Sequence, residues 1–357
     1  MSKNKSTVLS RCMMGFCLLL AFFACATVDA QNKGGSNTGA PDWIRDPYKK
    51  FDEKTNVAAV GIGNSRQTAE KDALGKLVAI FGQSIQVDEK ISTSYREAVQ
   101  SGAAASWSEN TAVDNSIVIS TGMDSLVGAE IGETWFDGKT NYYAAAVLNK
   151  NKALQTYSNL IKVNQAMIDN LVNMPAADRN SLDGFARYQF AAMIADITFT
   201  YGNLLSSIGA PSFAQGLKKG DDYRLEAQNI AKTIPVGITV KNDKSGRIQG
   251  AFAKAFADLG FRSGGTNARY VLAVDINTSP VELANQKNKF TRIEVTANLN
   301  DTSLNTVLFP FNFNSREGHT TQSEADNRAY AAAERKINEE YTELLSEYLS
   351  QLVPKKK

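Results

Sequence analysis

The sequence predicts an α+β fold of two modules, each a helix on an antiparallel sheet, that are joined by a helical connector. In residues 41–150 a strand, a helix and several alternating strands follow one another, and residues 233–353 repeat this order. Residues 151–232 carry apolar side chains at helical spacing without strand alternation. A chain of 357 residues suffices for about two such domains.

The first module begins with an apolar run at 56–63, which has the length of a strand. Asn64 or Ser65 can cap a helix over 65–82, and Gly82 is a suitable end. The apolar face of this helix comprises Ala69, Ala73, Leu74, Leu77, Val78 and Phe81.

Several strand signals follow that helix. Short signals occur at 85–87 and 117–119. Residues 127–135 and 143–147 alternate between apolar and polar on either side of Asp137-Gly138. Two alternating runs around an Asp-Gly turn predict a β-hairpin.

Two glycines, Gly61 and Gly63, lie between the first strand and the helix, where a dinucleotide-binding fold carries GxGxxG. The third glycine position is occupied by Arg66, and the strands that follow are predicted to be antiparallel. We therefore favour a tight strand-to-helix turn that needs the permissive backbone of glycine.

The connector is predicted to hold two helices. The first ends before Pro175, and the second covers 185–205. The first helix buries Ala153, Leu154, Tyr157, Leu160 and Ile161. Pro211 and the segment 216–222 are predicted to interrupt the remainder.

The second module starts with a strand at 235–240 and a helix that ends at Gly260. The buried face of that helix comprises Ile248, Phe252, Ala255, Phe256 and Leu259. Strands are predicted at 270–276, 290–299 and 304–313. A long helix over 325–352 closes the module, with a stripe of Ile337, Tyr341, Leu344, Leu345, Tyr348 and Leu352.

The N-terminus has the layout of a bacterial export signal, with a basic start, a short apolar run and a small residue before Cys25. It resembles a bacterial lipoprotein signal, which implies removal of residues 1–24 and lipid on Cys25. The alternative is ordinary cleavage after Ala30. Residues 25–40 are small and polar and are expected to form a flexible tether to the membrane.

Composition narrows the function. The formal net charge is +2, and the chain without residues 1–24 is near −1, which argues against a nucleic-acid partner. All three cysteines lie in the first 25 residues, so disulfides and thiolate metal sites are not expected after Cys25. The single histidine, His319, lies in a polar segment before the last helix, where a surface or capping role is expected.

A family resemblance appears in four segments of the first module. They are PDWI at 41–44, VGIGNS at 60–65, AEKDALGKLVAIFGQSIQV at 69–87 and WFDGKTNYYAAAVLNK at 135–150. Together they resemble the Lpp-twenty surface lipoprotein family and the amino-terminal domain of flagellar assembly protein T. The resemblance implies a compact domain of an envelope lipoprotein without established catalytic residues. The second half is similar to TolB amino-terminal and curli-secretion-lipoprotein domains.

Five aromatic residues of the first module form a candidate binding surface for a peptide or a glycan: Trp43, Tyr48, Trp135, Tyr142 and Tyr143. The alternative is that they pack in the core or on a sheet face. We expect no catalytic residues, no metal and no cofactor.

The expected function is non-catalytic binding or scaffolding at the outer membrane or the periplasmic face of the envelope. The partner would be an envelope protein or the cell-wall polymer. The alternatives are an oligomerising subunit of a flagellar or secretion complex, and an envelope hydrolase.

Overall fold

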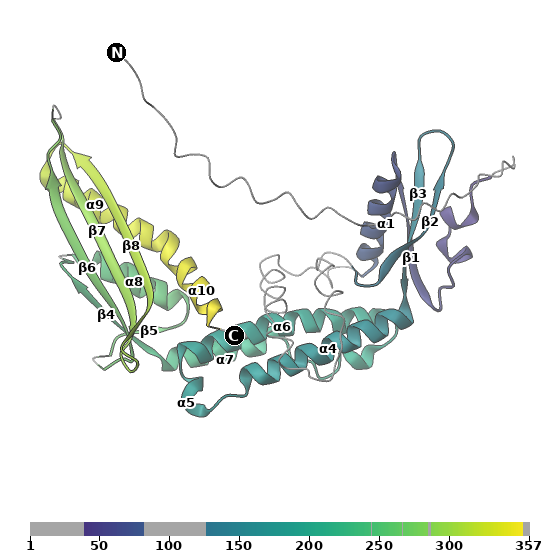
Figure 1. Ribbon diagram of the computed structural model, residues 1–357, viewed down its shortest axis with the longest axis horizontal. Coiled ribbons are helices and arrows are strands. Elements are labelled where there is room, and N and C mark those ends of the chain that lie inside the picture. The colour runs from purple at the N-terminus through teal and green to yellow at the C-terminus, as the bar shows by residue number, and fades with distance from the viewer. Residues whose placement is uncertain (1–38, 82–125, 244, 266, 285–286, 353–357) are drawn as a thin grey trace, which may run out of the picture. The chain divides into compact units, whose positions relative to one another are not determined.

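The computed structural model describes residues 39–81, 126–243, 245–265, 267–284 and 287–352 (Figure 1). Within these ranges, two sheets and the helices between and beside them confirm the predicted α+β class. Cys25, the predicted signal peptide and the strand signals at 85–87 and 117–119 lie outside the described residues. The domain boundaries proposed from the sequence stay predictions.

Within the described residues, the first sheet has three antiparallel strands in the order β1-β3-β2. Its elements are β1 (Asn56–Gly63), α1 (Arg66–Ile80), β2 (Ala129–Phe136) and β3 (Tyr142–Asn149). The predicted hairpin is confirmed. Gly138 has a φ of 77°, and the Asp137 carboxylate accepts hydrogen bonds from the backbone N–H groups of Lys139, Thr140 and Asn141.

Helix α1 packs against one face of this sheet at very short range. Ala69, Ala73 and Leu77 are fully buried there, whereas the predicted Leu74 and Val78 are half-buried. A Cβ added to Gly61 would lie 2.1 Å from the backbone N of Ala73. Glycine is therefore required for close approach of the helix, and not for the tight turn that the sequence suggested.

The opposite face of the first sheet is covered by the residues before β1 (Figure 1). They form two 3-10 turns, η1 (Asp42–Ile44) and η2 (Pro47–Lys49). Trp43 is only 6% exposed. A Cβ at Gly132 would lie 2.8 Å from Cζ of Phe51, so the Phe51 ring lies directly against β2.

The connector is helical, as predicted, but contains two more α-helices than the sequence indicated. Its elements are α4 (Lys150–Val172), α5 (Ala176–Arg179), α6 (Leu182–Ser207), η5 (Pro211–Phe213) and α7 (Gly220–Thr233). Helix α7 starts inside the predicted break at 216–222. Gly220 allows this close start, because a Cβ there would lie 2.2 Å from Oδ1 of Asp196. Asp221 and Asp222 then suit the positive end of the helix dipole.

The second sheet has five strands in the order β5-β4-β6-β7-β8. Its strands are β4 (Pro235–Lys241), β5 (Arg262–Ser263), β6 (Tyr270–Val281), β7 (Lys289–Asp301) and β8 (Thr306–His319). The helices are α8 (Arg247–Asp258), α9 (Gln322–Lys336), the π-helical turn η6 (Ile337–Tyr341) and α10 (Thr342–Gln351).

Two details of this module correct the sequence predictions. The sheet is mixed, because β4 runs parallel to β5 and β6. Helix α8 carries the chain back between β4 and β6, and such a crossover makes the two strands parallel. His319 is the last residue of β8, paired with Lys289, and does not lie in a loop.

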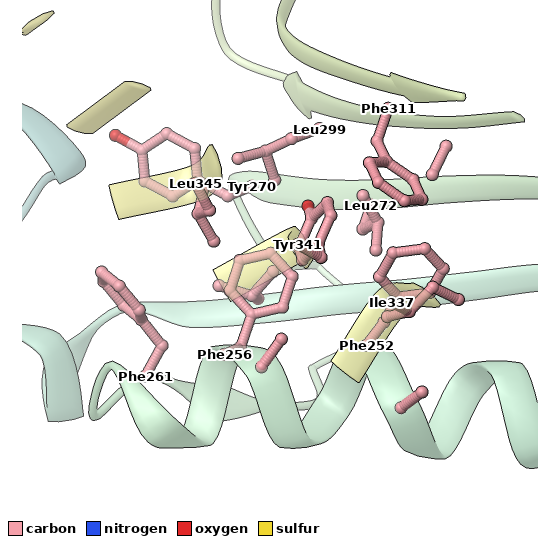
Figure 2. Packing of buried hydrophobic residues seen from close by; sticks show 14 of the residues in the cluster. Phe252, Phe256, Phe261, Tyr270, Leu272, Leu299, Phe311, Ile337, Tyr341 and Leu345 are labelled. Carbon is pink, nitrogen blue, oxygen red and sulfur yellow. The ribbon is translucent and has the colours of Figure 1, made fainter. Parts of the chain in front are cut away.

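The core of the second module lies between this sheet and the helices α8, α9 and α10. Figure 2 shows Tyr341 close to Phe252 and Phe256 of α8 and Phe311 of β8. Its ring centroid lies 4.8 Å from that of Phe252 and 5.3 Å from that of Phe311, both nearly edge-to-face. The Tyr341 hydroxyl is buried and has no hydrogen-bond partner among the described residues.

The π-helical turn sets the buried stripe of the last helix. The buried residues follow one another every four positions: Ala325, Ala329, Ala333, Ile337, Tyr341, Leu345 and Leu349. Four residues overshoot a 3.6-residue turn by about 40°, so a regular α-helix would rotate this stripe off the sheet. The wider π turn corrects the drift. The predicted Leu344 is consequently exposed, and Leu349 is buried in its place.

Asp301 is a buried carboxylate at the end of β7. Its Oδ2 accepts hydrogen bonds from Nε and Nη2 of Arg269, at 2.9 and 2.7 Å. Its Oδ1 accepts from Ser303 and from the backbone N–H of Leu304. Burial alone would raise the pKa of Asp301, but the hydrogen bonds from Arg269 and Ser303 outweigh it and hold the pKa at about 2.

Asp301→Asn is expected to lower the free energy of unfolding by about 2 kcal/mol at pH 7, because the variant loses the charge and two acceptor sites. The unfolded pKa is about 3.9, so this contribution is complete above about pH 4 and is lost as pH falls through 2. Urea denaturation at pH 7, 4 and 2 checks it. Asp258→Asn, which breaks the exposed pair with Lys254, should change stability by less than about 0.5 kcal/mol. An equal loss of stability in Asp301→Asn and Asp258→Asn would contradict a stabilising role of the buried Asp301 carboxylate.

Candidate functional site

One end of the first sheet carries a row of apolar and aromatic side chains across all three strands. Ile62 of β1 pairs with Tyr143 of β3, which pairs with Trp135 of β2. The Trp135 and Tyr143 rings lie 5.6 Å apart between centroids, tilted by 45°. Ile62 is 44% exposed and both rings are half-buried. We call Ile62, Tyr143 and Trp135 the aromatic row.

A second aromatic pair lies on the other face of the same sheet end. Phe136 and Tyr142 are neighbours across β2 and β3, with ring centroids 4.5 Å apart. Their third partner in the register is Gly63, which has no side chain to cover them. Phe136 is consequently 42% exposed. The sheet end beside the turn at 137–141 thus carries aromatic side chains on both faces.

Charged groups border the aromatic row. The Asp72 carboxylate of α1 accepts a hydrogen bond from the Ile62 backbone N–H at 2.9 Å and lies 2.8 Å from the Lys76 ammonium. The hydrogen bond from Lys76, and then that from Ile62, lowers the pKa of Asp72. Asp72 therefore binds β1 on the edge that faces away from β3. Glu133 lies two residues before Trp135 in β2 and forms an ion pair with Lys50.

The five aromatic residues singled out in the sequence lie in different environments. Trp135, Tyr142 and Tyr143 meet at the sheet end. Trp43 is part of the core, which is the alternative that the sequence left open, and it is not available to a partner. Tyr48 is half-buried in η2, where its backbone N–H donates to Asp46.

Two exposed apolar residues of this sheet end, Ile62 on one face and Phe136 on the other, were missed by sequence reasoning. Strand alternation places Ile62 on the face opposite Gly61 and Gly63. Those two glycines face α1, so Ile62 must face away from that helix. This signal was available in the sequence once the glycines were recognised as helix contacts.

Among the described residues, no three His, Cys, Asp or Glu side chains are grouped so as to hold a metal ion. None of the described helices has the length and apolarity needed to cross a membrane. The Nδ1 of His319 lies 3.3 Å from the Thr320 hydroxyl and 3.5 Å from the backbone N of Thr321, the N-cap of α9.

The first sheet and its helix form an α+β domain. Residues 41–149 match the family model described as LPP20 lipoprotein, which confirms the resemblance predicted over 41–150. No curated protein gives a significant match to the sequence. The resemblance of the second half to TolB and curli-secretion-lipoprotein domains stays a prediction.

Several solved structures are similar to this chain. The secreted protein HP1454 from Helicobacter pylori is 16% identical, with a TM-score of 0.41 over 80% of this chain and 98% of that one. A minor lipoprotein from Acinetobacter baumannii is 14% identical, with a TM-score of 0.25 over 34% of this chain and 94% of that one. Lipoprotein GNA1162 from Neisseria meningitidis is 10% identical, with a TM-score of 0.20 over 29% of this chain and 99% of that one.

Proposed function

We propose that this protein is an exported lipoprotein of the bacterial envelope, anchored through lipid on Cys25, that binds an envelope protein and catalyses no reaction. The observation that carries the binding role is the aromatic row, which leaves Ile62 44% exposed beside Trp135 and Tyr143. The match of residues 41–149 to a lipoprotein family supports the anchored state.

The aromatic row has the composition of an interface centre. Trp and Tyr dominate the binding energy of many protein interfaces, and they need apolar neighbours that exclude water. Here Ile62 supplies the apolar neighbour, while the Lys50–Glu133 and Asp72–Lys76 pairs supply a charged border. The row therefore suits a protein partner with an apolar centre of its own.

The anchor would make weak binding sufficient. Holding the chain at a membrane raises its effective concentration near partners in the same membrane by several orders of magnitude. Cys25→Ala should then abolish function in a deletion strain, whereas His319→Ala should complement it. The reverse outcome, with both variants folded, would overturn the proposal and favour an enzyme.

A site-specific crosslinking experiment in intact cells tests the surface. A photoreactive phenylalanine analogue at Ile62, the most exposed member of the aromatic row, is expected to give a discrete crosslinked protein. Adding Trp135→Ala should weaken that crosslink about tenfold, because truncating an aromatic anchor costs more than about 1 kcal/mol of binding. The matched control is the same analogue at Ile80, which is also exposed but lies on α1.

Three outcomes separate the readings of that experiment. A discrete band from position 62 that Trp135→Ala removes supports the proposed surface. A band of equal strength from positions 62 and 80 would contradict it. A broad product that lysozyme collapses would replace the protein partner by the cell-wall polymer.

A second candidate, an oligomerising subunit, is favoured by the position of β8. This strand of 14 residues ends the second sheet and, among the described residues, pairs with β7 alone. An open edge of this length can accept a strand from another chain, although Pro310 cannot donate there. Asn312→Pro would add a second proline to this strand. A defined oligomer in native mass measurements that this variant loses would favour the oligomerising subunit.

A further inference from the structure

A groove between α6 and α10 forms a second candidate binding site, separate from the aromatic row. We propose that it binds the apolar chain of a small amphiphile whose polar head carries no charge. The groove has a volume of about 350 Å³ and is open to solvent on one side. This is near the lower end of ligand pockets, which span about 300–1,000 Å³, and suits one chain rather than several.

One wall of the groove is a face of α6. Ala186, Gln189, Phe190 and Met193 line it at the spacing i, i+3, i+4 and i+7. Ala186 and Phe190 are buried, whereas Gln189 and Met193 are half-buried. Met193 is unbranched and can adapt to a flexible apolar chain.

The facing wall is formed by Ser346, Leu349 and Ser350 of α10, and Phe185 and Leu259 complete the apolar lining. Leu349 is buried, but the two serines are exposed and lie one helical turn apart. The groove is therefore apolar at its base and carries hydroxyl groups at its rim.

The charge at the groove argues for an uncharged head. Arg224 is the charged residue of the lining. Its Nη1 and Nη2 donate to Oδ2 of Asp196 at 2.7 and 2.8 Å, and its Nε donates to Asp221 at 3.2 Å. Two carboxylates thus accept hydrogen bonds from one guanidinium and offset its charge, so the groove offers no free positive charge to an anionic head.

The same residues can still recognise a neutral head. A guanidinium has five N–H donors, of which three are used here, so two remain for an ester or hydroxyl oxygen. Gln189 adds an amide that can donate and accept. Water alone fills an apolar groove poorly, because its hydrogen bonds find few partners there. An apolar chain with an ester or hydroxyl head can fill the apolar base of the groove and form hydrogen bonds with the polar groups at its rim.

Calorimetric titration of the full chain carrying Cys25→Ala tests this with two probes below their micelle concentrations, 1-monolauroylglycerol and laurate. The two share one acyl chain and differ in head charge. Monolauroylglycerol is expected to bind saturably at one site, and laurate about tenfold more weakly. Asp221→Asn removes a carboxylate that is 84% exposed, so the difference in affinity between monolauroylglycerol and laurate should become a few-fold smaller at low salt.

Two neighbouring substitutions on α10 provide the matched comparison. Ser346→Trp fills the groove and is expected to weaken monolauroylglycerol about tenfold or more, since losing the contacts of about two methylene groups has that effect. Glu347→Trp adds the same side chain one residue away, at an exposed position outside the groove, and should bind as the parent does. Circular dichroism confirms that both fold.

Either of two results overturns the proposal. One is the absence of saturable binding of monolauroylglycerol, which would leave the groove to an apolar side chain of a protein partner. The other is equal binding by Ser346→Trp and Glu347→Trp, which would place the chain elsewhere. Neither result bears on the aromatic row, whose crosslinks do not depend on this groove.

Discussion

Gly61→Ala is expected to lower the free energy of unfolding of the first module by about 3 kcal/mol, because the added methyl group cannot fit between β1 and α1. The new Cβ would lie 2.1 Å from N of Ala73 and 2.3 Å from O of Ala69. Both are backbone atoms, so no side chain can rotate out of the way. The helix must move off the sheet, and the burial of Leu77 is lost with it.

Gly75→Ala is the matched control for this variant. Gly75 lies in α1, is exposed, and an added Cβ there would have no atom within 4 Å beyond the neighbouring backbone of its own helix. Alanine is favoured over glycine inside a helix, so this change should raise stability by about 0.5–1 kcal/mol. Thermal and urea denaturation of both variants checks the pair. If Gly61→Ala melted with the parent, the close contact between α1 and β1 would be wrong.

Tyr341→Ala is expected to lower the free energy of unfolding by about 4 kcal/mol, because it opens a cavity where α8, the sheet and the last helix of the second module meet. The ring touches Phe252 and Phe256 of α8 and Phe311 of β8 (Figure 2). Its loss therefore loosens α8, the sheet and the last helix together.

Tyr341→Phe separates the ring from its hydroxyl. The hydroxyl is buried and has no partner among the described residues, so removing it should raise stability by about 1 kcal/mol. Burial also raises the pKa of Tyr341 well above that of a free phenol, so the parent shows no ionisation of this group near neutral pH. Chemical denaturation measures both variants. A loss of stability in Tyr341→Phe would show that the hydroxyl has a partner after all.

Local patterns predicted most of the two sheets. The run at 56–63 and the Asp137-Gly138 turn depend on neighbouring residues alone, and both elements were confirmed. The parallel β4–β6 pair could not be predicted in this way, because strand direction depends on where α8 returns the chain. Helix α7 was missed since Gly220, Asp221 and Asp222 have the composition of a loop. Only the contact with Asp196 explains the glycine.

The residues of the candidate sites likewise fall into those that a local pattern predicts and those that depend on the tertiary fold. Trp135 and Tyr143 were predicted because they alternate in a hairpin whose register follows from its turn. The burial of Trp43 depends on how residues 42–51 fold back over the sheet, which no local pattern encodes. The groove brings Gln189 together with Ser346, residues more than 150 positions apart in the sequence. Its existence could be learned only from the folded chain.

The π-helical turn η6 has a consequence for how the length of the last helix can vary. A π turn accommodates one residue more than an unbroken α-helix needs to connect the same two buried faces. A related chain that is one residue shorter between Ala333 and Leu345 can therefore keep both faces on the sheet. One that is a residue longer would turn Leu345 and Leu349 by about 100° toward solvent. Single-residue gaps among relatives are thus expected here, and single-residue insertions are not.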